Sequence, residues 1–174
     1  MDLNMGQLQI ARQFFENPTK SFQIRGLAKT LRIPKTTVSY QLRHLLLQGI
    51  IIKEKKGVFP SYRANDTAEA YRFCKRQDFL KRLMESKLLD YLEQKATQKC
   101  IFLFGSFAKA EYSKESDIDL FVQARDTQLD LRQYERLLGH KINILFEPEV
   151  RKLSTELLNN IVNGTKLQGF LKLR

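Results

Sequence analysis

The pattern of apolar and polar residues over the first third of the chain predicts a small helical unit that ends in a hairpin. Leu8, Ala11 and Phe15 recur at intervals of three and four, so they lie on one face of a first helix. This helix is expected to end at Asn17-Pro18, because the residue before a proline avoids the helical backbone region. The pattern also predicts helices over 24–31 and 35–48, and a hairpin from two β-rich runs over 50–52 and 58–63.

The segment 67–97 is expected to form one connecting helix. Asp66 and Glu69 have the spacing of a helix-capping box, and no glycine or proline follows before Ala96. The segment carries an apolar stripe made of Phe79, Leu80, Leu83, Met84, Leu88, Tyr91 and Leu92. Such a stripe either packs on its own chain, which is the simpler interpretation, or forms a dimer interface.

The last segment carries two aspartates in a spacing that points to chemistry. An apolar strand over 99–104 runs into Gly105-Ser106, and after ten residues Asp117-Ile118-Asp119 begins a second strand. Side chains at i and i+2 of a strand share a face, so Asp117 and Asp119 point the same way while the alternate residues face a core. Two carboxylates at this separation repel each other unless a cation lies between them.

Oxygen ligands of this kind suit Mg²⁺ or Mn²⁺, and such an ion commonly carries a nucleoside triphosphate. Gly105 lets the backbone come close to a phosphate, and the Ser106 hydroxyl can bind phosphate oxygens, especially where a helix begins. Neither Gly-Ser nor Asp-x-Asp is specific alone, but the two motifs on successive strands, ten residues apart, form a specific arrangement. We therefore expect a site for a metal ion and a nucleoside triphosphate; ATP is the nucleotide that the family resemblance described next would imply.

These motifs resemble the minimal nucleotidyltransferase family of the DNA polymerase β superfamily. The resemblance lies in GSFAKAEYSKESDIDLFV and LLGHKINILFEPEV, and it extends from about residue 98 to the C-terminus. It implies a mixed sheet flanked by helices, phosphates over Gly105 and Ser106, and Mg²⁺ bound by Asp117 and Asp119. The whole chain is then an α+β protein with three parts: 1–66, 67–97 and 98–174.

This chain departs from the family pattern at two positions. Asn143 stands where the family usually carries a third aspartate, and a neutral amide cannot accept a proton. Lys109 stands where arginine is common, and it can still pair with phosphate as a point charge. Glu147 could compensate for Asn143 only if its strand continues unbroken. The expected site consists of Asp117, Asp119 and Asn143, with Gly105, Ser106 and Lys109 at the phosphates.

Charge and composition narrow the range of partners. The chain has 30 Lys+Arg and 19 Asp+Glu, a net charge of +11, and residues 1–66 hold +7 of it. That excess favours an anionic partner such as nucleic acid. No apolar run approaches the roughly 20 residues that cross a bilayer, and no signal peptide is visible, so a cytoplasmic protein without membrane contact is expected. The two cysteines are expected in the core, and His44 and His140 at the surface or at helix caps.

The run TTVSYQLRHLLLQGIIIKEKKG resembles the recognition helix and wing of small prokaryotic winged helix-turn-helix regulators of the ArsR and MarR type. The resemblance covers about the first 65 residues and implies double-stranded DNA as a partner. A homodimer is expected, because one recognition helix covers a half-site. The expected DNA contacts are Lys35, Thr36, Thr37, Ser39, Tyr40, Arg43, Lys53, Lys55 and Lys56. A protein-interaction role for the same fold is the alternative.

Three functional hypotheses stay open. We favour a DNA-binding transcription regulator whose second domain binds a Mg²⁺–nucleotide with little catalysis, because Asn143 replaces the third carboxylate. The second hypothesis is an active nucleotidyltransferase that moves a nucleoside monophosphate, most plausibly AMP, onto a hydroxyl of a protein or small molecule. It includes the nucleotidyltransferase antitoxins, which modify a partner HEPN toxin. In the third, both domains are interaction scaffolds, against which the intact Asp117 and Asp119 argue.

Overall fold

The computed structural model describes residues 3–55 and 58–171, and it divides the chain into two compact units, Met1–Asp78 and Phe79–Arg174. The boundary falls inside helix α4 (Glu69–Glu85), so the predicted connecting segment is shared between the two units. Within the described ranges, no helix is both long enough and apolar enough to span a membrane.

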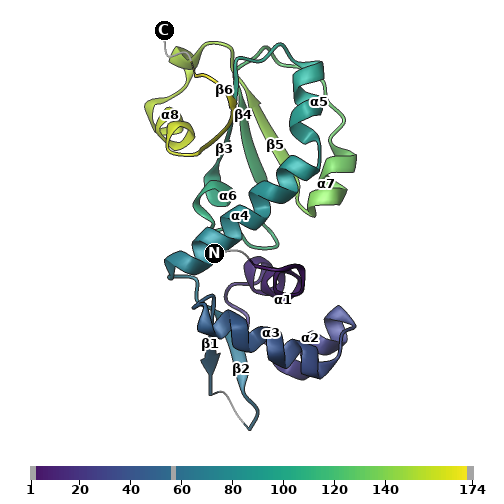
Figure 1. Cartoon of the computed structure of the whole chain (residues 1–174). Helices are drawn as coiled ribbons and strands as arrows, with labels where there is room; N and C mark the ends of the chain where they lie inside the picture. Colours follow the sequence, from purple (N-terminus) through teal and green to yellow (C-terminus); the bar gives the residue numbers. More distant parts are fainter. Residues whose placement is uncertain (1–2, 56–57, 172–174) are drawn as a thin grey trace. The chain divides into compact units, whose positions relative to one another are not determined.

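The first unit has three helices followed by a two-stranded antiparallel hairpin (Figure 1). Its elements are α1 (Met5–Glu16), α2 (Ile24–Leu31), α3 (Lys35–Leu47), β1 (Ile51–Glu54) and β2 (Ser61–Ala64). A reciprocal capping box between Asn4 and Gln7 starts α1, which ends at Asn17 before the proline. The three predicted helices are confirmed, whereas the second strand begins at Ser61, later than expected.

One hydrophobic core holds the first unit together. Its fully buried members include Ile10 and Phe14 of α1 and Val38, Leu42 and Leu45 of α3. The start of α4 joins this core through Tyr71, whose hydroxyl donates to the backbone carbonyl of Phe14 at 3.0 Å. Burial raises the pKa of Tyr71, so the hydroxyl keeps the proton that it donates.

The connecting segment forms two helices, so the prediction of one continuous helix was wrong. Helix α4 ends at Glu85, and α5 spans Leu88–Lys95. Between them the Ser86 hydroxyl donates to the Leu83 carbonyl at 2.6 Å and accepts from the Leu88 backbone N–H at 3.2 Å. A serine that bonds locally in this way competes with the helical pattern and ends α4 without glycine or proline.

The apolar stripe of this segment packs on its own chain, as the simpler interpretation predicted. Phe79, Leu83, Leu88 and Leu92 are fully buried in the core of the second unit. Met84 is the member that departs from the prediction, because its side chain is exposed.

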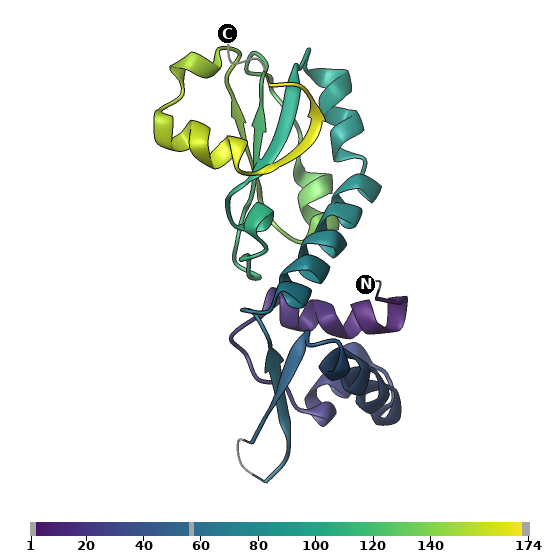
Figure 2. The same cartoon turned by 60° about the vertical axis from the view of Figure 1, so that its left-hand side comes forward.

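The second unit is a four-stranded mixed sheet with helices on both faces (Figures 1 and 2). Its strands, in the spatial order β5-β4-β3-β6, are β5 (Ile142–Phe146), β4 (Ile118–Val122), β3 (Cys100–Phe104) and β6 (Thr165–Gly169). Strands β4 and β5 are parallel, and the other neighbours are antiparallel. The remaining helices are α6 (Gly105–Lys109), α7 (Arg132–Leu138), the short η1 (Val150–Lys152) and α8 (Thr155–Val162). The predicted mixed sheet with flanking helices is confirmed.

The alternation of side chains gives this sheet two differently covered faces. On one face, Leu120 of β4 belongs to the same core as Leu138 of α7 and the buried residues of α5. On the opposite face, Phe121 packs in a second core with Ile161 of α8. Asp119 shares the face of Phe121, because the two residues are two apart on one strand. The two cysteines are buried, as predicted; they lie in separate cores and form no disulfide.

Candidate active site

Three predicted site residues meet at the start of the parallel strand pair. The register places Asp119 of β4 beside Asn143 of β5, and Asp117 lies immediately before β4. The Asn143 side-chain amide donates to Asp117 Oδ2 at 3.3 Å and to Asp119 Oδ1 at 3.2 Å. One neutral group therefore bridges two carboxylates, which confirms that the two aspartates point the same way.

Gly105 brings the first turn of α6 against the same carboxylates. Its φ of +70° lies in the left-handed region that favours glycine, and a Cβ atom built there would lie 2.5 Å from Asp119 Oδ2. Any larger residue would therefore displace the Asp119 side chain or the backbone. Ser106 follows as a half-buried residue, and Lys109 is exposed at the last position of α6.

The donor set at this site fits one hard divalent cation. Asp117 and Asp119 offer carboxylate oxygens on one side, and the absent Cβ of Gly105 leaves room beside Asp119. In the described ranges, no group of three or more His, Cys, Asp or Glu side chains could hold a metal. Two carboxylates are nevertheless enough for Mg²⁺, because this ion usually keeps several waters and takes further oxygens from substrate phosphates.

Comparisons with known proteins agree with this geometry. Residues 86–167 match the family model described as "Polymerase beta, Nucleotidyltransferase". A Methanocaldococcus jannaschii protein named "Putative protein adenylyltransferase MJ1379" is 34% identical over 67 residues, which cover 34% of this chain and 67% of that protein. The chain belongs to the polymerase beta nucleotidyltransferase family. Gly105, Asp117, Asp119 and Asn143 all lie inside the matched region.

His140 occupies a different place in the nucleotidyltransferase domain from the one predicted. It follows Gly139, which caps α7, but its side chain is buried and not at the surface. Its Nδ1 lies 2.8 Å from the backbone carbonyl of Ser116, next to Asp117. A helix-end position gave no sign of burial, because the contacting residues come from segments distant in sequence.

Glu147 does not take the role that an unbroken strand would have given it. Strand β5 ends at Phe146, and Glu147 Oε1 accepts the backbone N–H of Glu149 at 2.9 Å. The Glu147 carboxylate therefore serves the turn after β5, and Asn143 keeps the third position of the site.

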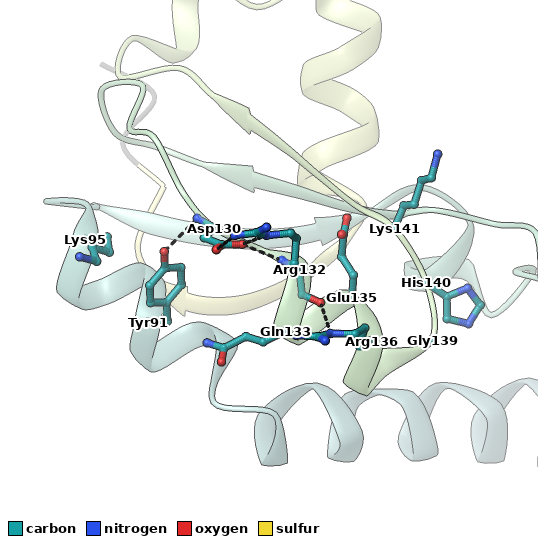
Figure 3. Close-up of a pocket in the computed structure, with 10 residues that line it drawn as sticks. All are labelled: Tyr91, Lys95, Asp130, Arg132, Gln133, Glu135, Arg136, Gly139, His140 and Lys141. Carbon is teal, nitrogen blue, oxygen red and sulfur yellow. Dashed lines mark hydrogen bonds and ion pairs between the residues drawn. The ribbon is translucent and has the colours of Figure 1, made fainter.

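A groove of about 940 Å³ lies elsewhere on the nucleotidyltransferase domain (Figure 3). Its lining residues come from α5, α7 and the adjoining turns, and they are Tyr91, Lys95, Asp130, Arg132, Gln133, Glu135, Arg136, Gly139, His140 and Lys141. In this groove the Arg132 guanidinium donates to both oxygens of Asp130, at 2.9 and 2.6 Å. These bonds lower the pKa of Asp130 to about 2. No sequence motif indicated this groove, and it contains none of the predicted site residues.

The residues predicted to contact DNA are exposed wherever the structure describes them. On α3, the exposed face carries Lys35, Thr36, Thr37, Ser39, Tyr40 and Arg43. Lys53 of β1 and Lys55 beyond it are also exposed, whereas Lys56 lies outside the described residues. Phe59, which the prediction left out, is exposed near this tip and receives the Arg25 guanidinium over its ring at 5.3 Å. A cation over an exposed ring has no local sequence signal.

Proposed function

We propose that the second domain binds a Mg²⁺– or Mn²⁺–nucleoside triphosphate, with ATP as the expected nucleotide, and transfers its nucleotidyl group slowly. The observation that carries this proposal is the pair of hydrogen bonds from Asn143 to both aspartates. In this proposal the Asn143 amide takes the position of a third carboxylate, which would help to hold a second ion and would accept the proton of an attacking hydroxyl. In this proposal, Asp117 and Asp119 still bind the metal ion, but Asn143 cannot accept a proton.

Each residue has a distinct part in this proposal. Asp117 and Asp119 would hold the ion, which when bound neutralises phosphate charge and orients the triphosphate. Gly105 would allow the backbone to approach the phosphates, and the Ser106 hydroxyl in the first turn of α6 would donate to their oxygens. The exposed Lys109 adds one positive charge near the end of the same short helix.

Calorimetric titration with ATP tests the nucleotide site. The natural protein should bind ATP only in the presence of Mg²⁺, and Asp117→Ala should lose that binding. Asp126→Ala removes an exposed carboxylate outside the site and serves as the matched control. Binding of ATP without Mg²⁺, or equal binding by Asp117→Ala and the natural protein, would refute the proposal.

A second candidate is rapid transfer of AMP to a hydroxyl of a protein, including an antitoxin role toward a HEPN-type partner. The archaeal relative, which is named "Putative protein adenylyltransferase MJ1379", favours it. Incubation with ATP labelled at the α-phosphate, together with a cell extract, separates the two candidates. A strongly labelled acceptor band that disappears with Asp117→Ala would favour rapid AMP transfer over a nucleotide-binding domain with slow transfer.

For the first unit, we propose DNA binding in a transcription regulator that acts as a homodimer in the cytoplasm, where ATP and chromosomal DNA are both available to a prokaryotic regulator. The support is the exposed polar face of α3 together with the basic tip of the hairpin. A helix with hydroxyl and Arg side chains outward can enter a major groove, and a basic hairpin can meet phosphates.

Fluorescence anisotropy with duplex DNA over a range of salt concentrations tests this role. Affinity should fall steeply with salt, because phosphate contacts release counterions. Arg43→Ala should weaken binding by about 1–3 kcal/mol if Arg43 reaches a base edge. Lys99→Ala removes one exposed cation from the second unit and should change the affinity far less. An affinity that does not change with salt would exclude DNA as the partner. Sedimentation with and without DNA would show whether the protein is a dimer.

A further inference from the structure

We propose that His140 is a positioning residue that holds the two halves of the nucleotide site, α6 and the turn before Asp117, in one arrangement. The inference rests on the proposed nucleotide site, and it adds a residue from outside the Gly-Ser and Asp-x-Asp motifs. Two independent sets of contacts support it, one through a ring nitrogen and one through the aromatic ring.

The polar contact fixes the turn that carries Asp117. His140 Nδ1 lies 2.8 Å from the Ser116 carbonyl oxygen, and a carbonyl only accepts, so Nδ1 carries the proton. Ser116 closes a turn with Ser113 through two bonds: its N–H donates to the Ser113 carbonyl at 3.0 Å, and its hydroxyl accepts the Ser113 N–H at 2.9 Å. The histidine therefore ties this turn to the segment between α7 and β5.

The apolar contact fixes α6. The rings of His140 and Phe107 form a T-shaped pair, with centroids 4.9 Å apart and an interplanar angle of 81°. Phe107 is stacked on Tyr112 at 4.1 Å, and both rings are fully buried. Phe107 lies two residues after Gly105, so the same imidazole supports the helix that is expected to meet the phosphates.

The backbone around His140 is anchored on both sides. Before it, the Gly139 N–H donates to the Glu135 carbonyl at 2.8 Å and ends α7. After it, the Lys141 carbonyl accepts the N–H of Ile118 at 2.8 Å, where the parallel pairing of β4 and β5 begins. In Figure 3, His140 is drawn at the opposite end of the groove lining from Tyr91 and Lys95. Because the backbone of His140 is held on both sides, its ring can hold both Ser116 and Phe107 in place.

A pair of substitutions separates the donor from the ring. His140→Phe keeps an aromatic ring for Phe107 but removes the donor to Ser116, whereas His140→Asn removes the ring but can place an amide N–H close to the position of Nδ1. If the donor positions Asp117, His140→Phe should weaken Mg²⁺-dependent ATP binding by about tenfold, the scale of a lost outer-shell contact. His140→Asn should retain more of the affinity than His140→Phe.

Hydrogen exchange of residues 113–117 without nucleotide gives a second readout that does not depend on ATP binding. Exchange should be faster in His140→Phe than in the natural protein and closer to natural in His140→Asn. Natural affinity and natural exchange in His140→Phe would overturn the inference, and so would equal loss in both variants. If His140→Phe does not fold, His140→Asn is compared with His140→Gln, whose amide reaches further; equal values for these two would also overturn it. If the natural protein binds no Mg²⁺–ATP, the proposed function fails, while the exchange measurement still decides the role of His140.

Discussion

The carboxylates at two places on the nucleotidyltransferase domain have different partners. In the groove, Asp130 is matched by the Arg132 guanidinium, which donates to both of its oxygens. At the candidate active site, Asp117 and Asp119 share the amide of Asn143, and no described cation lies within ion-pair distance of either. The groove carboxylate carries its own counter-ion, whereas the active-site carboxylates have only a neutral amide between them.

The difference explains why only one of the two places is a candidate for a metal ion. An amide offers partial positive charge from its N–H groups but no net charge, so it cannot offset two carboxylates. A guanidinium fork does so without any external ion. The carboxylate pair bridged only by an amide is therefore expected to bind a cation. The carboxylate paired with arginine is not.

The largest expected effect is on metal binding itself. Asp119→Asn should weaken the binding of Mn²⁺ by about tenfold or more, as measured by electron paramagnetic resonance without nucleotide. Asp130→Asn removes one carboxylate outside the candidate active site and should leave Mn²⁺ binding unchanged. Equal losses in both variants would show that the ion responds to overall charge and not to the bridged pair.

A smaller effect is expected from Gly105→Ala, which tests whether the site needs space beside Asp119. The left-handed backbone should cost about 1–2 kcal/mol of folding free energy, and the new Cβ would also press on Asp119 Oδ2. Gly49→Ala is the matched control, because Gly49 has φ +71° and open space around its Cβ position. Both variants should melt at lower temperature in calorimetry, but only Gly105→Ala should also lose affinity for Mg²⁺–ATP.

Asn143→Asp should make the stability of the domain depend more strongly on the metal ion. Three carboxylates in place of two repel one another, so the metal-free variant should lose about 1 kcal/mol of folding free energy. Mg²⁺ should restore the loss, because an ion that binds only the folded state stabilises it by mass action. Thermal melts with EDTA and with Mg²⁺ measure both changes, and slow nucleotidyl transfer should become faster. A variant that melts higher in EDTA would contradict the proposed arrangement.

The smallest effect concerns the titration of Asp130. Its pKa lies at about 2, below the usual 3.8, first because of the side-chain hydrogen bond from Arg132. A lowered carboxylate pKa stabilises the folded state above the unfolded value, and this contribution is lost as the pH falls from about 3.8 through about 2. In Arg132→Gln, the Asp130 pKa followed by NMR should rise toward 3.8, and added salt should reduce the difference between the two proteins.

The sequence predicted that Asp117 and Asp119 point the same way because their spacing is tied to a regular strand. Alternation along β4 placed Asp117 and Asp119 on one side, and the pairing of β4 with β5 brought Asn143 to them. The loss of a proton acceptor at position 143 could be predicted from the sequence, because asparagine replaces the aspartate that is usual in the family and an amide cannot accept a proton. Gly105 was predicted to meet a phosphate, but its close approach to Asp119 needed the folded strands.

The features that sequence could not predict depend on contacts between distant segments. The break at Ser86 comes from a side-chain hydroxyl that replaces helical bonds, in a segment with no glycine or proline. The burial of His140 needs Phe107 and Ser116, which lie more than twenty residues earlier. The groove combines α5 with α7 and so leaves no contiguous motif.

The parallel register of β4 and β5 has an evolutionary consequence. Backbone hydrogen bonds hold position 143 beside Asp119 whichever side chain it carries. Asparagine and aspartate have nearly the same shape, and their codons differ at one base. A single point mutation could therefore exchange the amide for a carboxylate without rebuilding the sheet, and under the proposed function this one change would make slow nucleotidyl transfer faster.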